Sequence, residues 1–269
     1  ADIITELGPD QIKTVEAISG CHVVGGPIMN IRVLVYDSTN PVLADPRVRR
    51  ALSLAIDRKL IVDTLYDGRT TVTRGLQHPS FGPLYLADYQ PPGYDPDAAR
   101  ALLKAAGYDG APILYRILNN YYALQVQTAQ VLVEMWQAVG LKVNIEVKEN
   151  FSQVLEAKGG RGIYDTSDTI FWQDPVGIVV RRYGPASGVQ AQYKTWSNAE
   201  FNKLCDTLQT SLDTDERRRA VAAALKIYDE TDPPGTTLHT LAMFYGKRRD
   251  LHWTPYEAEF MDFRAANMT

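Results

Sequence analysis

Apolar residues recur at helical spacing in several segments that begin with a capping residue. Two Asp-Pro dipeptides each open such a run, because an Asp side chain caps free backbone N–H groups and the fixed φ of Pro suits the first helical turn. The first dipeptide predicts a helix over residues 46–58, and a second helix over residues 59–66 follows it. The second dipeptide predicts a helix over residues 97–106 that ends at Gly107.

A strand–helix–strand unit is predicted in the middle of the chain. Residues 112–118 form a short apolar run that fits a strand buried on both faces, and residues 123–139 place apolar side chains on one helical face. Residues 141–147 then alternate apolar and polar positions with the period of a strand. A crossover helix between two strands predicts that the strands run parallel.

The remaining pattern predicts further helices and strands. A glycine-rich turn over residues 159–162 and a loop-rich region up to Asn198 separate them. We expect helices over residues 152–158, 199–212 and 217–230, and strands over residues 169–172 and 237–245. Strands interleaved with helices indicate an α/β fold or a mixed α+β fold.

The composition excludes several classes of protein. The chain has 269 residues, of which 45% are hydrophobic, so it has enough apolar side chains for a large core. Its formal net charge of −4 is not the electrostatic signature of a nucleic-acid-binding protein. No apolar run approaches the length of a membrane-spanning helix, and the first residues lack the basic and apolar regions of a signal peptide.

The two cysteines are not arranged as a metal or redox motif. Cys205 shares an apolar helical stripe with Phe201, Leu204, Leu208 and Leu212, which predicts a packing role in the core. A disulfide between Cys21 and Cys205 is the alternative, since the sequence does not show whether they are neighbours.

Three carboxylates near Trp172 are the strongest candidates for catalysis. Asp165, Asp168 and Asp174 would suit a carboxylate- or metal-dependent hydrolase if they met in a cleft. Asp165 and Asp168 flank a strand, however, where polar residues usually mark strand ends, and their spacing is not that of an EF-hand. The hydrolase is therefore an alternative hypothesis.

No other motif indicates enzyme chemistry. The turn at residues 159–162 lacks the Lys and Ser or Thr of a phosphate-binding loop, and no Ser lies in a G-x-S-x-G elbow. The histidines are scattered, with none three or four residues from another: His22, His78, His239 and His252. We expect no catalytic residue, no metal site and no cofactor.

Two loops that follow predicted strands carry aromatic and amide side chains. In α/β folds ligands bind at loops beyond strand ends, and aromatic walls with a few polar groups suit an organic solute. The sequence therefore predicts a ligand site formed by Asn119, Asn120, Tyr121, Tyr122, Trp172, Gln173, Asp174 and Tyr183. The alternative is that Tyr121 and Trp172 only cover the edge of the sheet.

Four segments, read in order, resemble one protein family. Residues 1–11 read ADIITELGPDQ, residues 45–58 read DPRVRRALSLAIDR, residues 95–108 read DPDAARALLKAAGY and residues 140–143 read GLKV. They resemble, in the same order, GEVDIITNLPPDQ, D-x-R-V-R-x-A-L-x-x-A-I-D-R, D-P-x-x-A-K-x-L-L-x-E-A-G-Y and G-I-x-V of the family 5 bacterial extracellular solute-binding proteins. These are the oligopeptide- and dipeptide-binding components of ABC importers.

The resemblance implies a fold like that of type II periplasmic binding proteins, in which two lobes surround a cleft. It implies that residues 1–31 are a remnant of lobe one, that residues 32–246 are lobe two and that residues 247–269 return to lobe one. Lobe two would be the α/β or mixed α+β lobe that binds substrate. The chain is thus expected to be a fragment whose signal peptide lies outside it, and to bind its solute weakly or not at all by itself.

The resemblance also assigns roles by position. Trp172 corresponds to the cleft tryptophan of the family, and residues 119–122 correspond to a loop that reaches the ligand. Peptide-binding members usually place an acid three residues after this tryptophan to hold the ammonium group of the peptide, with an Asp-Pro further on. In this sequence Asp174 and Pro175 come almost directly after Trp172. Asp174 therefore corresponds to the aspartate of the Asp-Pro pair, and no separate acid remains to hold the ammonium group of a peptide. A peptide, another nitrogenous solute or a sugar-like solute is therefore expected.

The implied function is transport without catalysis. The lobes would close on a peptide or other small organic solute and deliver it to an ABC permease, in the periplasm or outside the cell as a tethered lipoprotein. The lobe-one remnants and bare strand edges also predict self-association with a second copy of the chain.

Overall fold

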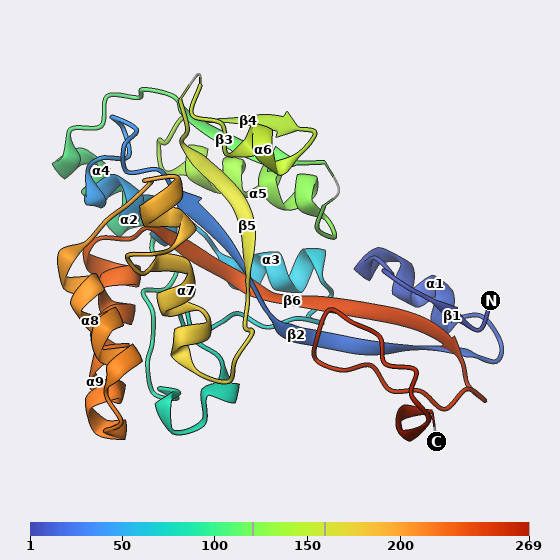
Figure 1. Ribbon diagram of the computed structural model, residues 1–269. Helices are drawn as coiled ribbons and strands as arrows, with labels where there is room; N and C mark the ends of the chain where they lie inside the picture. The colour runs from blue at the N-terminus through green and yellow to red at the C-terminus, as the bar shows by residue number, and fades with distance from the viewer. Residues whose placement is uncertain (120, 159, 269) are drawn as a thin grey trace.

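In the computed structural model, which describes residues 1–119, 121–158 and 160–268, helices pack against one mixed sheet (Figure 1). The strands are β1 (Ile3–Ile4), β2 (Cys21–Tyr36), β3 (Ile113–Leu118), β4 (Val143–Lys148), β5 (Ile163–Thr169) and β6 (Gly235–Arg248). The α-helices are α1 (Ile12–Glu16), α2 (Pro46–Leu54), α3 (Arg58–Leu65), α4 (Pro96–Ala106), α5 (Gln125–Ala138), α6 (Phe151–Val154), α7 (Val179–Tyr183), α8 (Ala199–Thr210) and α9 (Thr214–Lys226). Short 3₁₀ and π turns are η1 (Pro9–Gln11), η2 (Pro79–Leu84), η3 (Pro175–Gly177), η4 (Gly188–Gln192), η5 (Ile227–Thr231) and η6 (Ala265–Asn267).

The strands of the described residues pair in the order β1-β6-β2-β5-β3-β4. β3 runs parallel to β4 and β5, whereas β2 is antiparallel to β5 and β6. The parallel β3–β4 pair, joined by α5, confirms the predicted strand–helix–strand unit. The paired strands β2 and β6 extend beyond the rest of the sheet as a two-stranded ribbon, and both chain termini lie at the far end of this ribbon in Figure 1.

Two buried apolar clusters cover opposite faces of the sheet. Ile31, Val33 and Val35 of β2 pack with side chains of α7, α8 and α9, whereas Leu34 and Tyr36 pack with side chains of α2 to α5. This division follows from the alternation of side chains along a strand. The sheet is therefore the middle layer of a helix–sheet–helix arrangement, and each fully buried apolar side chain contributes roughly 1.5–3 kcal/mol to folding.

The predicted helix caps are confirmed. The side chain of Asp45 accepts a hydrogen bond from the backbone N–H of Arg47 at 2.8 Å, and that of Asp95 accepts one from the N–H of Ala98 at 2.8 Å. Gly107 ends α4 with a φ of 69°, a left-handed conformation that glycine adopts without strain.

The predicted position of one strand is wrong. The strand expected at residues 169–172 is β5, which covers Ile163–Thr169 and ends where the prediction begins. Asp165 and Asp168 consequently lie within the strand rather than at its ends, and both are buried. Each forms an ion pair with an arginine, so their polarity is compensated inside the fold. A polar residue in a sequence is usually taken to be exposed. The sequence could not show that an arginine pairs with each of these two carboxylates, so the strand was predicted in the wrong place.

The packing role predicted for Cys205 is confirmed, because its side chain lies in the apolar cluster formed with α7, α8 and α9. Cys21 and Cys205 are both free thiols, the first half-buried and the second buried. Among the helices of the described residues, none has the length and apolar character that crossing a membrane would require.

Candidate binding cleft

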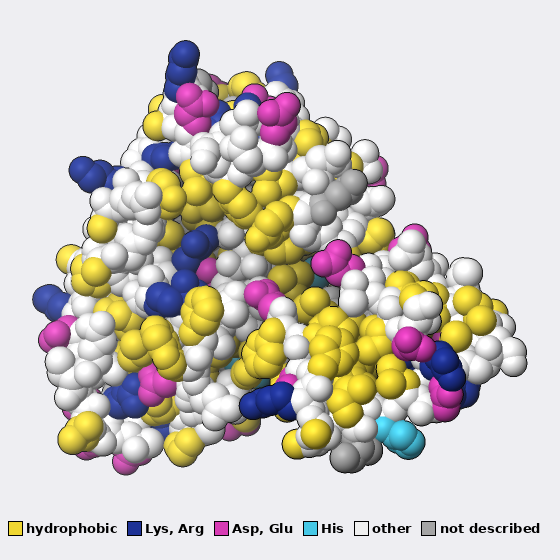
Figure 2. Space-filling model, turned by 45° about the vertical axis from the view of Figure 1, so that its right-hand side comes forward, with side chains coloured by type: hydrophobic (Ala, Val, Ile, Leu, Met, Phe, Trp, Pro, Cys, Tyr) yellow, Lys and Arg dark blue, Asp and Glu magenta, His cyan; other side chains and the backbone are white. Residues whose placement is uncertain are grey.

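A cleft of about 830 Å³ lies between the ends of β3 and β4 and the segments near the two chain termini. Its aromatic side consists of Tyr66, Tyr121, Tyr122 and Phe151, and Thr166, Ser167 and Thr169 of β5 also contribute to it. Residues of the N- and C-terminal segments complete it, among them Glu6, Asp10 and Glu259. Figure 2 shows this face hollowed between the larger body of the molecule and a smaller part, with hydrophobic and acidic side chains around the hollow.

The topology of the sheet places the aromatic side chains together. Tyr121 and Tyr122 follow β3, and Phe151 follows the parallel strand β4, so the two loops lie at the same edge of the sheet. The ring of Tyr121 lies edge-on to Tyr122 and to Phe151, with centroid distances of 4.7 Å and 5.0 Å. Tyr121 nevertheless remains 59% exposed, which leaves a large aromatic surface available to a solute.

A buried ion pair lies beneath this aromatic surface. The guanidinium group of Arg32 on β2 donates to both carboxylate oxygens of Asp165 on β5, and neither side chain is exposed. The ring of Tyr122 covers the guanidinium group at 4.1 Å from its centroid, a cation–π contact. Neither Arg32 nor Asp165 lines the cleft, so the ion pair lies below the lining and supports it.

Gln125, at the start of α5, connects this ion pair to the aromatic loop. Its side-chain amide donates to Asp165 Oδ2 at 3.2 Å, while its carbonyl oxygen accepts from the backbone N–H groups of Tyr121 and Tyr122 at 3.1 Å and 3.3 Å. Gln125 is buried, so these hydrogen bonds satisfy a side chain that water does not reach. Through Gln125, the Asp165 carboxylate that pairs with Arg32 also helps to fix the loop of Tyr121 and Tyr122.

The protonation states around the cleft follow from burial. Burial raises the pKa of the Tyr122 hydroxyl to about 12, so the group stays neutral at physiological pH. Burial alone would lower the pKa of Arg32, but the adjacent Asp165 carboxylate more than offsets this effect, and the pKa is raised. Burial lowers the pKa of His239, whose ring lies 4.5 Å from that of Tyr66, to about 4. This histidine is therefore neutral.

The structure brings only part of the predicted ligand site into the cleft. Tyr121 and Tyr122 line it, and the exposed Asn119 directly precedes that loop without lining the cleft. Asn120 lies outside the described residues.

The other predicted site residues follow β5. Trp172 is 56% exposed and Gln173 is exposed, and neither lines the cleft in this structure although Thr169 just before them does. Asp174 accepts hydrogen bonds from the guanidinium group of Arg217 and from the backbone N–H of Val176. These contacts give Asp174 a structural role at the start of η3.

Tyr183, also predicted as a site residue, lies in the core. Its hydroxyl donates to Asp168 Oδ2 at 3.1 Å, and its ring packs edge-on against Tyr228. The side chain is fully buried, so no solute reaches it in this structure.

The three carboxylates of the hydrolase hypothesis do not converge. Asp165 and Asp168 lie three residues apart in β5, and side chains at odd separations along a strand point to opposite faces. Asp165 pairs with Arg32, Asp168 with an arginine of α7 and Asp174 with one of α9. In the part of the chain that the structure describes, no group of three His, Cys, Asp or Glu side chains is arranged to hold a metal ion.

Several lining residues were missed by the sequence analysis. Phe151 follows β4 as Asn119 follows β3, so the rule that parallel strands end at one edge would have found it. Tyr66 gave no local signal, because its place depends on how α3 packs on the sheet. The acidic side chains of the terminal segments lie more than a hundred residues from the aromatic loop in sequence.

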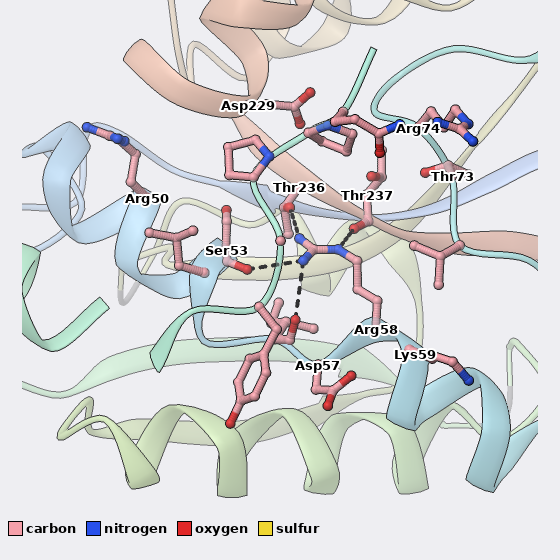
Figure 3. A pocket seen from close by; sticks show the side chains of 18 residues that line it. Arg50, Ser53, Asp57, Arg58, Lys59, Thr73, Arg74, Asp229, Thr236 and Thr237 are labelled. Carbon is pink, nitrogen blue, oxygen red and sulfur yellow. Dashed lines mark hydrogen bonds between the residues drawn. The ribbon is translucent and has the colours of Figure 1, made fainter. Parts of the chain in front are cut away.

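A second cavity, of about 440 Å³, lies between α2, α3 and residues 90–94. Figure 3 shows the guanidinium group of Arg58 near its centre, hydrogen-bonded to Ser53, Thr236 and Thr237, while Arg50 and Lys59 lie at the periphery. These bonds tie the start of α3 to β6, so Arg58 has a structural role. The cavity also lacks the row of packed aromatic rings found in the first cleft, which we therefore regard as the candidate site.

Comparisons with known proteins identify the family of the chain. The sequence model of a family described as bacterial extracellular solute-binding proteins, family 5 Middle, matches residues 1–188. The glutathione-binding protein GsiB of Salmonella paratyphi A is 28% identical over 236 residues, which are 86% of this chain and 42% of GsiB. The chain thus spans less than half the length of this curated relative.

Solved structures share the fold. The periplasmic binding protein DppA from Helicobacter pylori, in complex with the peptide STSA, matches 96% of this chain and 50% of its own with a TM-score of 0.82 and 17% identity. NikA from Staphylococcus aureus, in complex with Ni(L-His)2, matches 97% of this chain and 56% of its own, with a TM-score of 0.82 and 17% identity. The expected mixed α/β fold of type II periplasmic binding proteins is confirmed.

Proposed function

Because the chain belongs to the family 5 bacterial extracellular solute-binding proteins, we propose that it is the substrate-binding component of an ABC importer. It captures a peptide or a similar small organic solute in the cleft and presents it to a membrane permease. The site of action is the periplasm, or the outer surface of the cell if the protein is a tethered lipoprotein. The solute leaves chemically unchanged, because the role is binding and release.

One observation carries this proposal: the aromatic cleft at the common edge of β3 and β4. Its volume of about 830 Å³ is in the range of sites that enclose small organic molecules. The exposed ring of Tyr121 supplies apolar contact area, and the hydroxyl groups of Thr166 and Ser167 supply hydrogen bonds. A solute with both apolar and polar groups fits this lining.

We further propose that the cleft lies between two lobes, with residues 32–246 as lobe two and residues 1–31 and 247–269 as parts of lobe one. The course of the ribbon supports this division, because β2 and β6 carry both terminal segments away from the helix–sheet–helix body (Figure 1). Solute that contacts both sides would favour a closed arrangement over an open one by the difference in its affinity for the two.

Self-association through the terminal segments is part of the same proposal. Four exposed apolar side chains support it: Ile4, Ile18, Phe260 and Phe263. Apolar side chains gathered at one end of a molecule favour contact with another protein surface. Light scattering that gives the mass of a monomer at all concentrations would contradict this part of the proposal.

The test of the proposed function is titration of the ¹⁵N-labelled chain with a panel of short peptides and sugars, followed by NMR. Glutathione and the peptide STSA, named for GsiB and DppA, belong in the panel as probes. We expect concentration-dependent shifts of the backbone amides of Tyr121, Tyr122 and Phe151, with micromolar to millimolar dissociation constants. A folded chain that shows no shifts with any solute would refute the proposal.

A further inference from the structure

The charged side chains that line the cleft are all acidic. Glu6 and Asp10 come from the N-terminal segment, and Glu259 comes from the C-terminal segment. Among the described lining residues there is no Lys, Arg or His, and none of the three carboxylates forms an ion pair within the described part of the chain. Three carboxylates without counter-ions create a negative potential that a solute entering the cleft would meet.

Neighbouring positive groups do not cancel this potential. The buried cation beneath the aromatic loop, Arg32, is paired with Asp165 and covered by Tyr122. The amino-terminal end of α5 approaches the cleft at Leu124, but a helix end carries only about half a positive charge. Three full negative charges outweigh this half charge, so the electrostatic potential in the cleft is negative.

The aromatic side of the cleft is also suited to cations. The ring of Tyr122 already holds the guanidinium group of Arg32 on one face at 4.1 Å. The neighbouring ring of Tyr121 is mostly exposed and has no cation against it within the described residues. A cation between an aromatic face and carboxylates gains from both the ring quadrupole and the ionic attraction.

We propose that the cleft selects a cationic solute, such as a peptide with a Lys or Arg side chain or another organic ammonium compound. The proposal rests on the proposed function and specifies its substrate class. The ammonium or guanidinium group lies between the carboxylates of Glu6, Asp10 and Glu259 and the ring of Tyr121. The carboxylate of a zwitterionic solute points toward the amino-terminal end of α5.

The test compares three tripeptides that differ only in the charge of the central side chain: Ala-Lys-Ala, Ala-Gln-Ala and Ala-Glu-Ala. NMR titration gives the dissociation constant of each, even when binding is weak. We expect the Lys peptide to bind about three- to tenfold more tightly than the Glu peptide, a difference of about 0.65–1.4 kcal/mol, because exposed ion pairs are weak. The preference should decrease at high salt, because salt screens exposed charges.

Variants identify the carboxylates responsible. The triple variant Glu6→Gln, Asp10→Asn and Glu259→Gln keeps the shape of the cleft and should bind the three tripeptides with nearly equal affinity. The matched control is Glu134→Gln, which removes an exposed carboxylate of α5 outside the cleft and should preserve the preference for the Lys peptide. Amide NMR spectra of each variant establish that it is folded.

The possible outcomes separate this inference from the proposed function. Equal affinities for the three tripeptides in the unmodified chain, or tightest binding of the Glu peptide, would overturn cation selection while leaving solute binding intact. A preference for Lys that survives in the triple variant would also overturn it, since the carboxylates would not be its source. Absence of binding by every tripeptide and by the wider panel would refute both.

Discussion

Arg32 on β2 and Asp165 on β5 form an ion pair that is completely buried beneath the aromatic side of the cleft. The pair is part of a larger network, because Gln125 links Asp165 to the backbone of the aromatic loop and Tyr122 of that loop covers Arg32. The sheet and the loop are therefore held in one arrangement by groups that water does not reach. Changes in this network should affect both the stability of the fold and the geometry of the cleft.

Breaking the ion pair should strongly destabilise the protein. The variant Asp165→Asn leaves the guanidinium group of Arg32 buried without a counter-ion, and such a loss costs about 3–5 kcal/mol in the free energy of unfolding. Urea denaturation measures the change. The matched control is Asp63→Asn, which breaks the exposed Lys59–Asp63 pair and should change the same free energy by less than about 1 kcal/mol.

A double variant tests whether the cost arises from the unpaired charge. Arg32→Met combined with Asp165→Leu removes both charges, so it should be more stable than Asp165→Asn alone. If the double variant is less stable than the single one, packing around the pair rather than its charge compensation determines stability.

Gln125 should position the aromatic loop. The variant Gln125→Leu removes the acceptor of the Tyr121 and Tyr122 N–H groups, so we expect the loop to lose its fixed arrangement and solute affinity to fall about tenfold, equal to about 1.4 kcal/mol. NMR titration measures the affinity, and the amide signals of Tyr121 and Tyr122 report the change in the loop. Gln130→Leu, at an exposed position of the same helix, is the control and should change neither.

Tyr121 should contribute to binding through its ring. We expect Tyr121→Ala to weaken solute binding about five- to tenfold because it removes exposed aromatic surface, whereas Tyr121→Phe should retain most of the affinity. Tyr94→Ala removes a similarly exposed tyrosine from the second cavity and serves as the control. Equal losses in Tyr121→Ala and Tyr94→Ala would place the binding surface elsewhere.

The sequence predicts the local elements well where a cap and a periodic apolar face coincide. The helices that begin at Asp45 and Asp95 and the parallel strands on either side of α5 are such cases. Their signals are local, because the capping side chain and the apolar stripe lie within a few residues of each other.

Features that depend on distant partners were not predictable in the same way. The sequence pattern placed Asp165 and Asp168 at the end of a strand rather than inside one. It could not show that Arg32 and Arg182, which lie elsewhere in the sequence, pair with these carboxylates. The length of β2 is hidden by Gly25, Gly26 and Pro27, residues that usually interrupt a strand. The acidic side of the cleft contains residues from both ends of the chain. These ends lie close together because β2 and β6 pair as a ribbon, and the sequence does not show this pairing.

The buried His239 and the half-buried Asp229 should give opposite contributions to the pH dependence of stability. Burial lowers the pKa of His239 to about 4, so between about pH 4 and 6.5 the unfolded chain binds more protons, and His239 makes the fold more stable as the pH rises. Burial raises the pKa of Asp229 to about 7, so between about pH 4 and 7 the folded chain binds more protons, and Asp229 makes the fold less stable as the pH rises.

The variant Asp229→Asn removes the second contribution. We expect its free energy of unfolding to rise with pH more steeply than that of the unmodified chain, by up to about 1.4 kcal/mol per pH unit. Urea denaturation between about pH 4.5 and about pH 6.5 measures both slopes. The variant His239→Gln should change the slope in the opposite direction. Identical slopes in the variant and the unmodified chain would show that Asp229 is ionised throughout this range in the folded protein.

Gly25 should be required for the ribbon that carries the terminal segments. It has a φ of +105°, and a Cβ atom at this position would lie 2.1 Å from the backbone oxygen of Met243 on β6. The variant Gly25→Ala combines this clash with an unfavourable backbone conformation, so we expect a loss of about 2–5 kcal/mol in the free energy of unfolding. Gly20→Ala is the control, because Gly20 also has a positive φ of +80° but a Cβ atom there would have no described atom within 4 Å beyond its chain neighbours.

The comparison of these two glycine variants separates backbone strain from strand contact. Gly20→Ala should lose only about 1–2 kcal/mol, the cost of the left-handed conformation. Because the ribbon formed by β2 and β6 carries the acidic side of the cleft, Gly25→Ala should also weaken binding of the Lys tripeptide, whereas Gly20→Ala should not. Urea denaturation and NMR titration measure the two effects. Equal losses of stability in both variants would show that the backbone of the ribbon shifts to accommodate a Cβ atom at position 25. The close approach to Met243 would then not limit the choice of residue there.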